Sequence, residues 1–158
     1  MKKALIIYYS QSGNTKRMAE AVREGLEEEG GVEVELRSVD RVAIEDLLGM
    51  DAILIGSPTY YGTMSWQTKK LLDESVKYHS KLEGKVGAAF SSSAQVGGGN
   101  ETTIMDILKA MLIHGMIVQG NPSADHYGPV AIGAPDDRAS KNCVQLGQRV
   151  ARLLKRLD

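Results

Sequence analysis

A short run of hydroxyl, amide and glycine residues follows the first apolar segment of the chain and has the composition of an anion-binding loop. Backbone N–H groups converge where a strand turns into a helix, and the helix dipole favours negative charge there. We therefore predict a phosphate site that needs no cation. An ordinary helix cap is the alternative, because Ser, Asn and Thr are preferred cap residues. The run consists of Ser10, Gln11, Ser12, Gly13, Asn14 and Thr15.

The spacing in this loop excludes several phosphate-handling motifs. A P-loop needs GxxxxGK followed by Ser or Thr, and Lys16 stands at the wrong distance from Gly13 with no earlier glycine. A dinucleotide fold needs GxGxxG after its first strand, which is absent here. A cysteine phosphatase needs a cysteine in the loop, whereas the only cysteine is Cys143 near the C-terminus. With nucleotide triphosphates, dinucleotides and phosphatase substrates excluded, we expect the loop to bind a phosphomonoester permanently.

Two further loops follow apolar strand patterns and have the groups to hold a planar ring. In the second loop, two tyrosines offer faces for stacking and a glycine allows close backbone approach. In the third loop, hydroxyl and backbone groups can bind the polar edge of a heterocycle. A plain turn and a flexible connector are the alternatives. The second loop contains Pro58, Thr59, Tyr60, Tyr61 and Gly62, and the third contains Ser91, Ser92, Ser93, Gly97, Gly98 and Gly99.

Strand and helix patterns alternate along the chain, which predicts an α/β domain with a doubly wound parallel sheet. The spacing fits the strand order 2-1-3-4-5, and in such sheets ligands bind at the carboxyl ends of the strands. We therefore expect the three loops to meet at one edge. Strands are predicted at 3–9, 32–36, 51–56, 85–90 and 116–118, with a return to the sheet at 130–132, and helices at 14–29, 65–78, 101–114 and 139–157.

Composition narrows the function further. The chain has 158 residues, 19 Lys or Arg and 20 Asp or Glu, so its net charge of −1 argues against a dedicated nucleic-acid surface. One domain over residues 1–158 is expected. A single cysteine suits a reducing compartment, and no signal peptide or membrane span is recognised, so a cytoplasmic protein is expected. No metal site is expected.

The motifs taken together resemble a known family. SQSGNT is similar to the phosphate loop of flavodoxins, and SPTYYGTMSWQTKKLLDES resembles the PT-x-[FY]-G-x-M segment of WrbA-type NAD(P)H:quinone oxidoreductases. FSSSAQVGGGNETT and the later HGM and YG segments are similar to that family too. The resemblance implies a flavodoxin-like five-stranded sheet with helices on both faces, and FMN as a non-covalent cofactor. Its phosphate would lie at residues 10–15, and its ring against residues 58–62 with residues 91–93 and 97–99 at its polar edge.

The resemblance does not determine the roles of several individual residues. His114 matches a histidine near the ring in that family and could seat a nicotinamide or quinone, but a helix C-cap is the preferred interpretation. The family's ring-stacking tryptophan is missing, and Tyr78 or His79 could replace it. Trp66 is interpreted as core packing. The segment between strands two and three is shorter than in WrbA-type proteins, which puts their tetramer in doubt, although a homo-oligomer is compatible with the sequence.

Two functions follow from the resemblance. In the first, NAD(P)H reduces FMN, which passes electrons to a quinone or another small acceptor; the near-neutral charge and the PTYYG segment favour it. In the second, the protein is a flavodoxin-type carrier between redox proteins, which the short chain favours. Carriers of that kind are strongly acidic around the flavin, and this chain lacks such a field. A regulatory FMN-binding module is a third alternative.

Overall fold

Burial on both faces of the first strand organises the fold. In the computed structural model, which describes residues 1–157, β1 (Lys2–Tyr8) directs Ala4 and Ile6 into one apolar cluster and Leu5 and Ile7 into another. Successive side chains of a strand point to opposite faces, so an uninterrupted apolar run needs cover on both sides. Helical layers on the two faces supply this cover.

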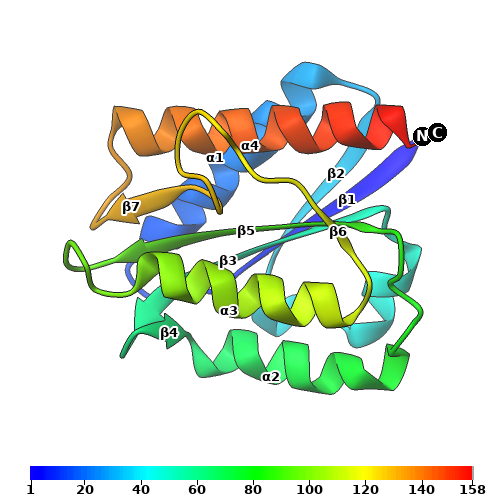
Figure 1. Ribbon diagram of the computed structural model, residues 1–158, viewed down its shortest axis with the longest axis horizontal. Coiled ribbons are helices and arrows are strands. Elements are labelled where there is room, and N and C mark those ends of the chain that lie inside the picture. Colours follow the sequence, from blue (N-terminus) through cyan, green and yellow to red (C-terminus); the bar gives the residue numbers. More distant parts are fainter. Residues whose placement is uncertain (158) are drawn as a thin grey trace.

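The two helical layers lie on opposite sides of the sheet, as Figure 1 shows. One layer consists of α1 (Asn14–Glu29) and α4 (Asp137–Arg156). The other consists of α3 (Asn100–Ile113) and of α2 (Trp66–Glu74), which the 3-10 turn η3 (Ser75–Tyr78) continues. Within the described residues, no helix is both long and apolar enough to cross a membrane.

The sheet has the predicted strand order. The path runs β2 (Val32–Ser38), β1, β3 (Ala52–Tyr60), β5 (Val86–Ser93) and β6 (Ile117–Val118), all paired in parallel. This is the order 2-1-3-4-5, so the predicted flavodoxin-like α/β fold is confirmed. β2, in which Val32, Val34 and Leu36 alternate with charged residues, lies at the edge of the sheet. The 3-10 turns η1 (Val39–Arg41) and η2 (Ile44–Gly49) connect β2 to β3.

Two short strands bring the total in the sheet to seven. β4 (Thr63–Met64) pairs antiparallel with the end of β3. β7 (Val130–Ile132) pairs with Ser91–Ser93 of β5, whereas β6 pairs with the opposite end of the same strand. The predicted fifth strand is thus split in two by residues 119–129. Two prolines in that segment, Pro122 and Pro129, lack the N–H group that a continuous ladder requires.

Two glycines allow α1 and α4 to pack at backbone distance. A Cβ atom on Gly147 would lie 2.2 Å from the carbonyl oxygen of Val22, and one on Gly25 would lie 1.9 Å from that of Val144. Both obstacles are backbone atoms, which cannot rotate away. The close approach of these helices seals one face of the central strands, with Met18 and Leu146 in the same apolar cluster.

We expect Gly147→Ala to destabilise the protein by about 1–3 kcal/mol, because the added methyl group forces α1 and α4 apart. Urea unfolding followed by circular dichroism measures this change. Gly49→Ala is the matched control, since nothing lies within 4 Å of a Cβ at that position. Equal stability of the two variants would contradict the tight helix packing.

Cys143 of α4 is expected to be inert in the folded protein. Burial, and secondarily the Asp125 carboxylate, raises the pKa of its thiol from 9.0 to about 12. The ionised fraction near pH 8 is then about a thousandfold below that of an ordinary thiol, in addition to steric protection. Disulfide exchange with a chromogenic thiol reagent should be undetectable until denaturant is added. Rapid reaction in the native protein would contradict this burial.

Candidate active site

The carboxyl ends of β1, β3, β5 and β7 surround a cleft of about 490 Å³. This volume lies within the range of small-molecule sites. Residues from all three predicted loops line it, so the structure brings the loops together as expected from a parallel sheet. The lining residues are Gln11, Ser12, Asn14, Thr15, Pro58, Thr59, Tyr60, Ser92, Ser93, Ala94 and Gly133.

The first loop presents unpaired backbone donors to the cleft. Gly13, the N-cap residue of α1, has φ 92°, and its N–H donates to Ser10 Oγ at 3.1 Å. Among the described residues, no acceptor pairs with the N–H groups of Gln11, Ser12, Asn14 or Thr15. Free amides at a helix N-terminus are suited to a phosphate group.

No cationic side chain of the described residues contributes to this cradle. Within residues 1–157, the residues that line the cleft include no Lys or Arg. Lys16 is exposed, and its Nζ lies 3.9 Å from Oε1 of Glu20, one turn further along α1. An anion in this site would therefore be bound by hydroxyl groups and backbone N–H dipoles and not by a positive charge. The composition of the loop predicts such a site.

Hydroxyl contacts tie the three loops to one another. Thr15 Oγ1 and Ser92 Oγ lie 3.0 Å apart and join the first loop to the third. Thr59 Oγ1 lies 3.0 Å from Ser91 Oγ, which in turn donates to the carbonyl oxygen of Ser57 at 2.8 Å. Because Thr15, Ser91 and Ser92 are buried and Thr15, Thr59 and Ser92 line the cleft, these contacts form part of its floor.

Tyr60 forms one wall of the cleft. Its hydroxyl group donates to Gln11 Oε1 at 3.1 Å, and its ring meets that of Tyr9 edge-on with centroids 6.3 Å apart. Burial, followed by the neighbouring Tyr9, raises the pKa of Tyr60, so its phenol stays neutral. The next residue, Tyr61, has φ 48° and a fully exposed side chain. The two tyrosines thus differ: one is held in place, and the other is free to contact a ligand or partner.

The tip of the second loop touches the start of α3. A Cβ atom on Gly99 would lie 2.7 Å from Cα of Gly62, and Thr102 Oγ1 donates to the Gly62 carbonyl oxygen at 2.7 Å. Gly62 and Gly99 both have positive φ. Only glycine allows these two backbones to approach so closely at that geometry.

Several predicted site residues do not line the cleft, and two lining residues were not predicted. Ser91 lies beneath the cleft, and Ala94 extends the serine run by one residue. Gly133 follows β7, and its N–H donates to the Ser93 carbonyl oxygen at 2.8 Å. Because ligands bind at the carboxyl ends of parallel strands, the predicted strand at 130–132 could have indicated Gly133 as a site residue. The predicted site residues that do not line the cleft are Ser10, Gly13, Tyr61, Gly62, Ser91, Gly97, Gly98 and Gly99.

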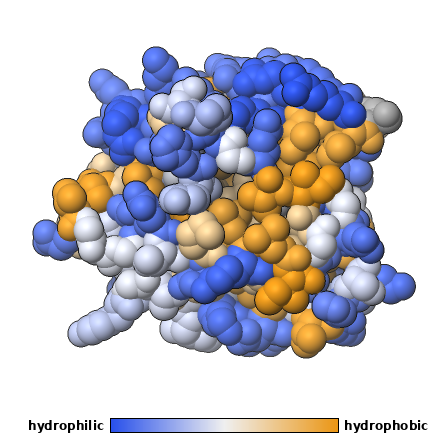
Figure 2. Space-filling view, in the orientation of Figure 1, coloured by the Kyte–Doolittle hydropathy of each residue, from blue (hydrophilic) through white to orange (hydrophobic). Residues whose placement is uncertain are grey.

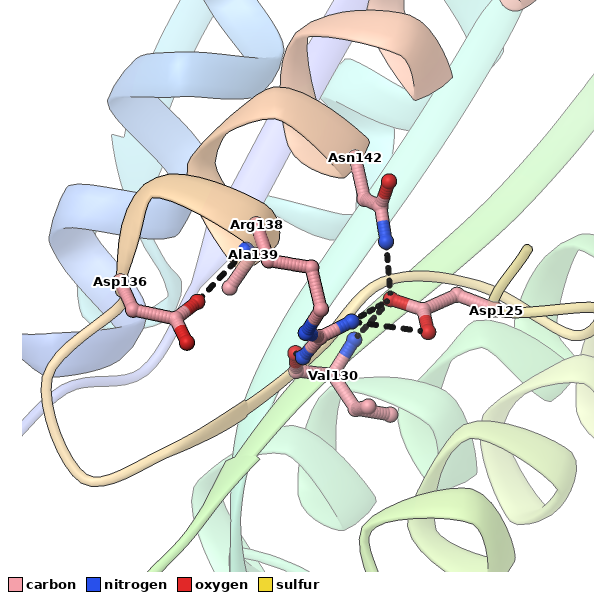
Figure 3. Close-up of polar contacts among 6 residues, drawn as sticks. All are labelled: Asp125, Val130, Asp136, Arg138, Ala139 and Asn142. Atoms are coloured by element: carbon pink, nitrogen blue, oxygen red, sulfur yellow. Dashed lines mark hydrogen bonds and ion pairs between the residues drawn. The ribbon is translucent and has the colours of Figure 1, made fainter.

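A half-buried carboxylate, that of Asp125, holds β7, the strand that directly precedes Gly133. Figure 3 shows Asp125 accepting hydrogen bonds from Arg138, Asn142 and the N–H group of Val130. Arg138 also donates to the Val130 carbonyl oxygen at 2.8 Å, so both backbone groups of Val130 are satisfied on the side away from β5. Asp136 caps α4 by accepting from the Ala139 N–H at 2.8 Å. The 133–135 connection is therefore fixed at both ends.

The structure does not bring His114 to the cleft. It caps the C-terminal end of α3, whereas the cleft lies near the N-terminal end, and fourteen helical residues separate these ends by about 20 Å. Tyr78 and His79 lie at the end of η3, where the Tyr78 hydroxyl donates to Glu45 Oε1 at 3.0 Å. Neither lines the cleft, so a ring-stacking role for them receives no support from their positions.

The prediction that Trp66 packs in the core is wrong, because its side chain is 68% exposed. The buried face of α2 contains Thr68 and Leu71. Trp66 precedes Thr68 by two residues, which places it about 200° away around the helix. It contributes instead to a shallow surface hollow beside Val39 and Val42.

We expect Asp125→Asn to loosen the 133–135 wall of the cleft, because the loss of charge weakens the Arg138 contacts and turns one acceptor oxygen into a donor. Hydrogen exchange at the Val130 and Gly133 amides should accelerate about tenfold or more. Asp137→Asn is the control, since it changes the same charge on an exposed residue at the start of α4. Unchanged exchange in Asp125→Asn would contradict the role of this carboxylate.

Comparison with known proteins agrees with this site. The family model described as flavodoxin matches residues 6–111. A flavodoxin of Aquifex aeolicus (strain VF5) is 40% identical over 159 residues, covering 96% of this chain and 86% of the relative. An NAD(P)H dehydrogenase (quinone) of Archaeoglobus fulgidus is 34% identical over 191 residues, covering 99% of this chain and all of the relative.

A solved structure extends the likeness to the whole fold. The crystal structure titled as the flavodoxin, WrbA-like protein from Agrobacterium tumefaciens superimposes with a TM-score of 0.86 at 30% identity, with full coverage of both chains. The predicted resemblance to flavodoxin-like proteins of the WrbA type is thus confirmed. With its parallel sheet, its neutral phosphate loop and these relatives, the chain belongs to the flavodoxin family, whose cofactor is FMN.

Proposed function

We propose that this flavodoxin-family protein transfers electrons from NAD(P)H through FMN to a quinone or another small acceptor. FMN, when bound, supplies a ring that accepts a hydride and gives up electrons, and the protein binds and orients it. The uncharged lining of the cleft supports this function most directly, because the reduced nicotinamide ring of NAD(P)H and the ring of a quinone are both neutral. The proposal treats residues 1–158 as one FMN-binding domain.

The residues of the cleft divide the task of holding FMN. The free amides and hydroxyls of residues 10–15 would bind the phosphate. Tyr60 is held by Gln11 and Tyr9 at the wall where the ring would lie, and the segment around Gly133 would close the opposite wall. The exposed Tyr61 stands at the rim, where a substrate ring can stack on it.

The near-neutral charge of the chain also favours a small acceptor. A field of one sign raises the encounter rate between two charged proteins, and a net charge of −1 provides little such steering. A relative is named NAD(P)H dehydrogenase (quinone), which gives the proposed reaction a precedent within the family.

A flavodoxin-type carrier is the second candidate, and chain length is the observation that favours it. The quinone dehydrogenase relative aligns over 191 positions, which exceeds the 158 residues of this chain by 33. The flavodoxin of Clostridium saccharobutylicum aligns over 161 positions at 35% identity and covers 98% of this chain. Insertions in the dehydrogenase are therefore missing here, which argues against a tetramer that depends on them, and a homo-oligomer of another kind stays a prediction.

We expect Thr15→Val to weaken FMN binding about tenfold, because it removes a buried hydroxyl at the phosphate loop while keeping the side-chain volume. Fluorescence titration of the apoprotein with FMN gives the dissociation constant. Lys16→Gln is the neighbouring control and should change it less than about twofold, since the proposed cradle uses no cation. A tenfold loss in Lys16→Gln would contradict a neutral phosphate site.

We expect the FMN-loaded protein to oxidise NADH or NADPH when a benzoquinone is present, with rates that saturate in both substrates. Absorbance at the nicotinamide band follows the reaction, and free FMN at the same concentration is the control. No consumption above that control, with a stable one-electron-reduced flavin in a reductive titration, would select the carrier instead.

A further inference from the structure

A second hollow, larger than the FMN cleft, lies between α2 and α3 and has no part in the proposed function. Its volume is about 790 Å³, within the range of small-molecule sites. Figure 1 shows the two helices side by side in one layer. We call this hollow the α2–α3 groove. It is lined by Thr63, Met64, Lys69, Leu72, Asp73, Val76, His79, Asp106, Lys109, Ala110, Ile113 and His114.

The walls of the groove are stripes of facing helix residues. On α2 and η3 the lining positions follow helical spacing, and on α3 the same spacing runs to His114. Apolar side chains dominate at the end of the groove next to the C-terminus of α3, where the side chains of Val76 and Ile113 are 69% and 71% exposed. Figure 2 shows apolar surface gathered around the C-terminal part of α3. The groove is thus open and mostly apolar at that end.

The charged residues of the groove neutralise one another. Lys69 Nζ lies 2.6 Å from Asp73 Oδ1, and Lys109 Nζ lies 2.6 Å from Asp106 Oδ1. Thr63 Oγ1 also donates to Asp106 Oδ2 at 2.6 Å. Each lysine therefore has a carboxylate from its own helix, and the rim leaves no net charge to attract an ion. A neutral ligand suits this groove best.

His114 closes the far end of the groove, and its hydrogen bonds define which of its nitrogens holds the proton. Its side chain is buried, with the residue 8% exposed, and Nε2 lies 2.8 Å from Ser75 Oγ. The Ser75 hydroxyl uses its single proton to donate to the Leu72 carbonyl oxygen at 2.6 Å. Nε2 must therefore donate to Ser75, because that oxygen has no second proton to give.

The other nitrogen of His114 is left as a bare acceptor. Burial, followed by the neighbouring His79, lowers the pKa of His114, which keeps the imidazole neutral at physiological pH. The rings of these two histidines lie 6.1 Å apart. Among the described residues, nothing donates to His114 Nδ1. A buried acceptor without a partner is unfavourable, so a donor supplied from the groove would be stabilised there.

We propose that the α2–α3 groove binds a neutral, mostly apolar ligand with one hydroxyl donor, of the phenol class, whose O–H group donates to His114 Nδ1. A quinone or a carboxylate offers only acceptors and would leave Nδ1 unpaired. An aromatic ring also suits the Met64 thioether and the two imidazoles that line the groove. This site lies at the far end of α3 from the FMN cleft and does not depend on the proposed reaction.

The test compares 4-ethylphenol with 4-ethylanisole on the FMN-loaded protein. The two probes share ring and alkyl group, and the ether lacks only the donor. Amide resonances of α2 and α3 should shift saturably, with the phenol binding about tenfold more tightly. The Nδ1 resonance of His114 should move with the phenol and not with the ether. Equal affinities, or shifts confined to the FMN cleft, would overturn the proposal.

Two neighbouring variants separate the groove from the rest of α3. Ile113→Asp places a charge in the groove and should weaken phenol binding about tenfold or more. Leu112→Asp is the matched control, because Leu112 is 56% exposed on the same helix but does not line the groove. Both variants alter exposed side chains, and thermal unfolding checks that each one folds. Equal loss in the two variants would overturn the assignment of the groove.

Analytical sedimentation tests whether a second copy of the chain, and not a small ligand, occupies the α2–α3 groove. We expect phenol affinity to be independent of protein concentration. Affinity that rises on dilution, together with a dimer that Ile113→Asp dissociates, would replace the phenol-type ligand by a homodimer contact.

Discussion

The parallel pairing of the three central strands is the constraint on which the site depends. Tyr8 of β1 lies opposite Gly56 of β3, and Gly56 lies opposite Phe90 of β5. A Cβ atom at Gly56 would come 2.1 Å from Cε2 of Phe90, so the register requires glycine there. Because the strands run in the same direction in this register, their carboxyl ends reach one edge together. The three loops begin at that edge for this reason alone.

Small side chains then turn a shared edge into a defined cleft. Hydroxyl contacts join the loops: Thr15 and Ser92 are both buried, and the buried Ser91 contacts the half-buried Thr59. Asp125 completes the cleft from outside the sheet by holding β7 against β5. The protein thus organises a neutral phosphate site with backbone donors rather than with cations, and the near-zero net charge is consistent with that design.

Much of the fold could be predicted because burial leaves a strong mark on the sequence. The unalternated runs of β1 and β3 and the alternating β2 indicate central and edge strands, and alternating strands and helices give the sheet order. Single positions were harder. Trp66 was misplaced because apolar character does not reveal which side of a helix faces the core. Gly133 was missed because β7 has only three residues and lies far along the chain from the other loops.

The sequence by itself determined the order of the strands and the polar, cation-free chemistry of the three loops, since both follow from local pattern and residue type. Only the tertiary structure decided which groups meet. Ser75 and His114 are 39 residues apart and share a hydrogen bond, and Asp125 reaches Asn142 across 17 residues. The α2–α3 groove likewise exists only because two helices pack side by side on one face of the sheet. Such contacts depend on long-range packing, which no local pattern encodes.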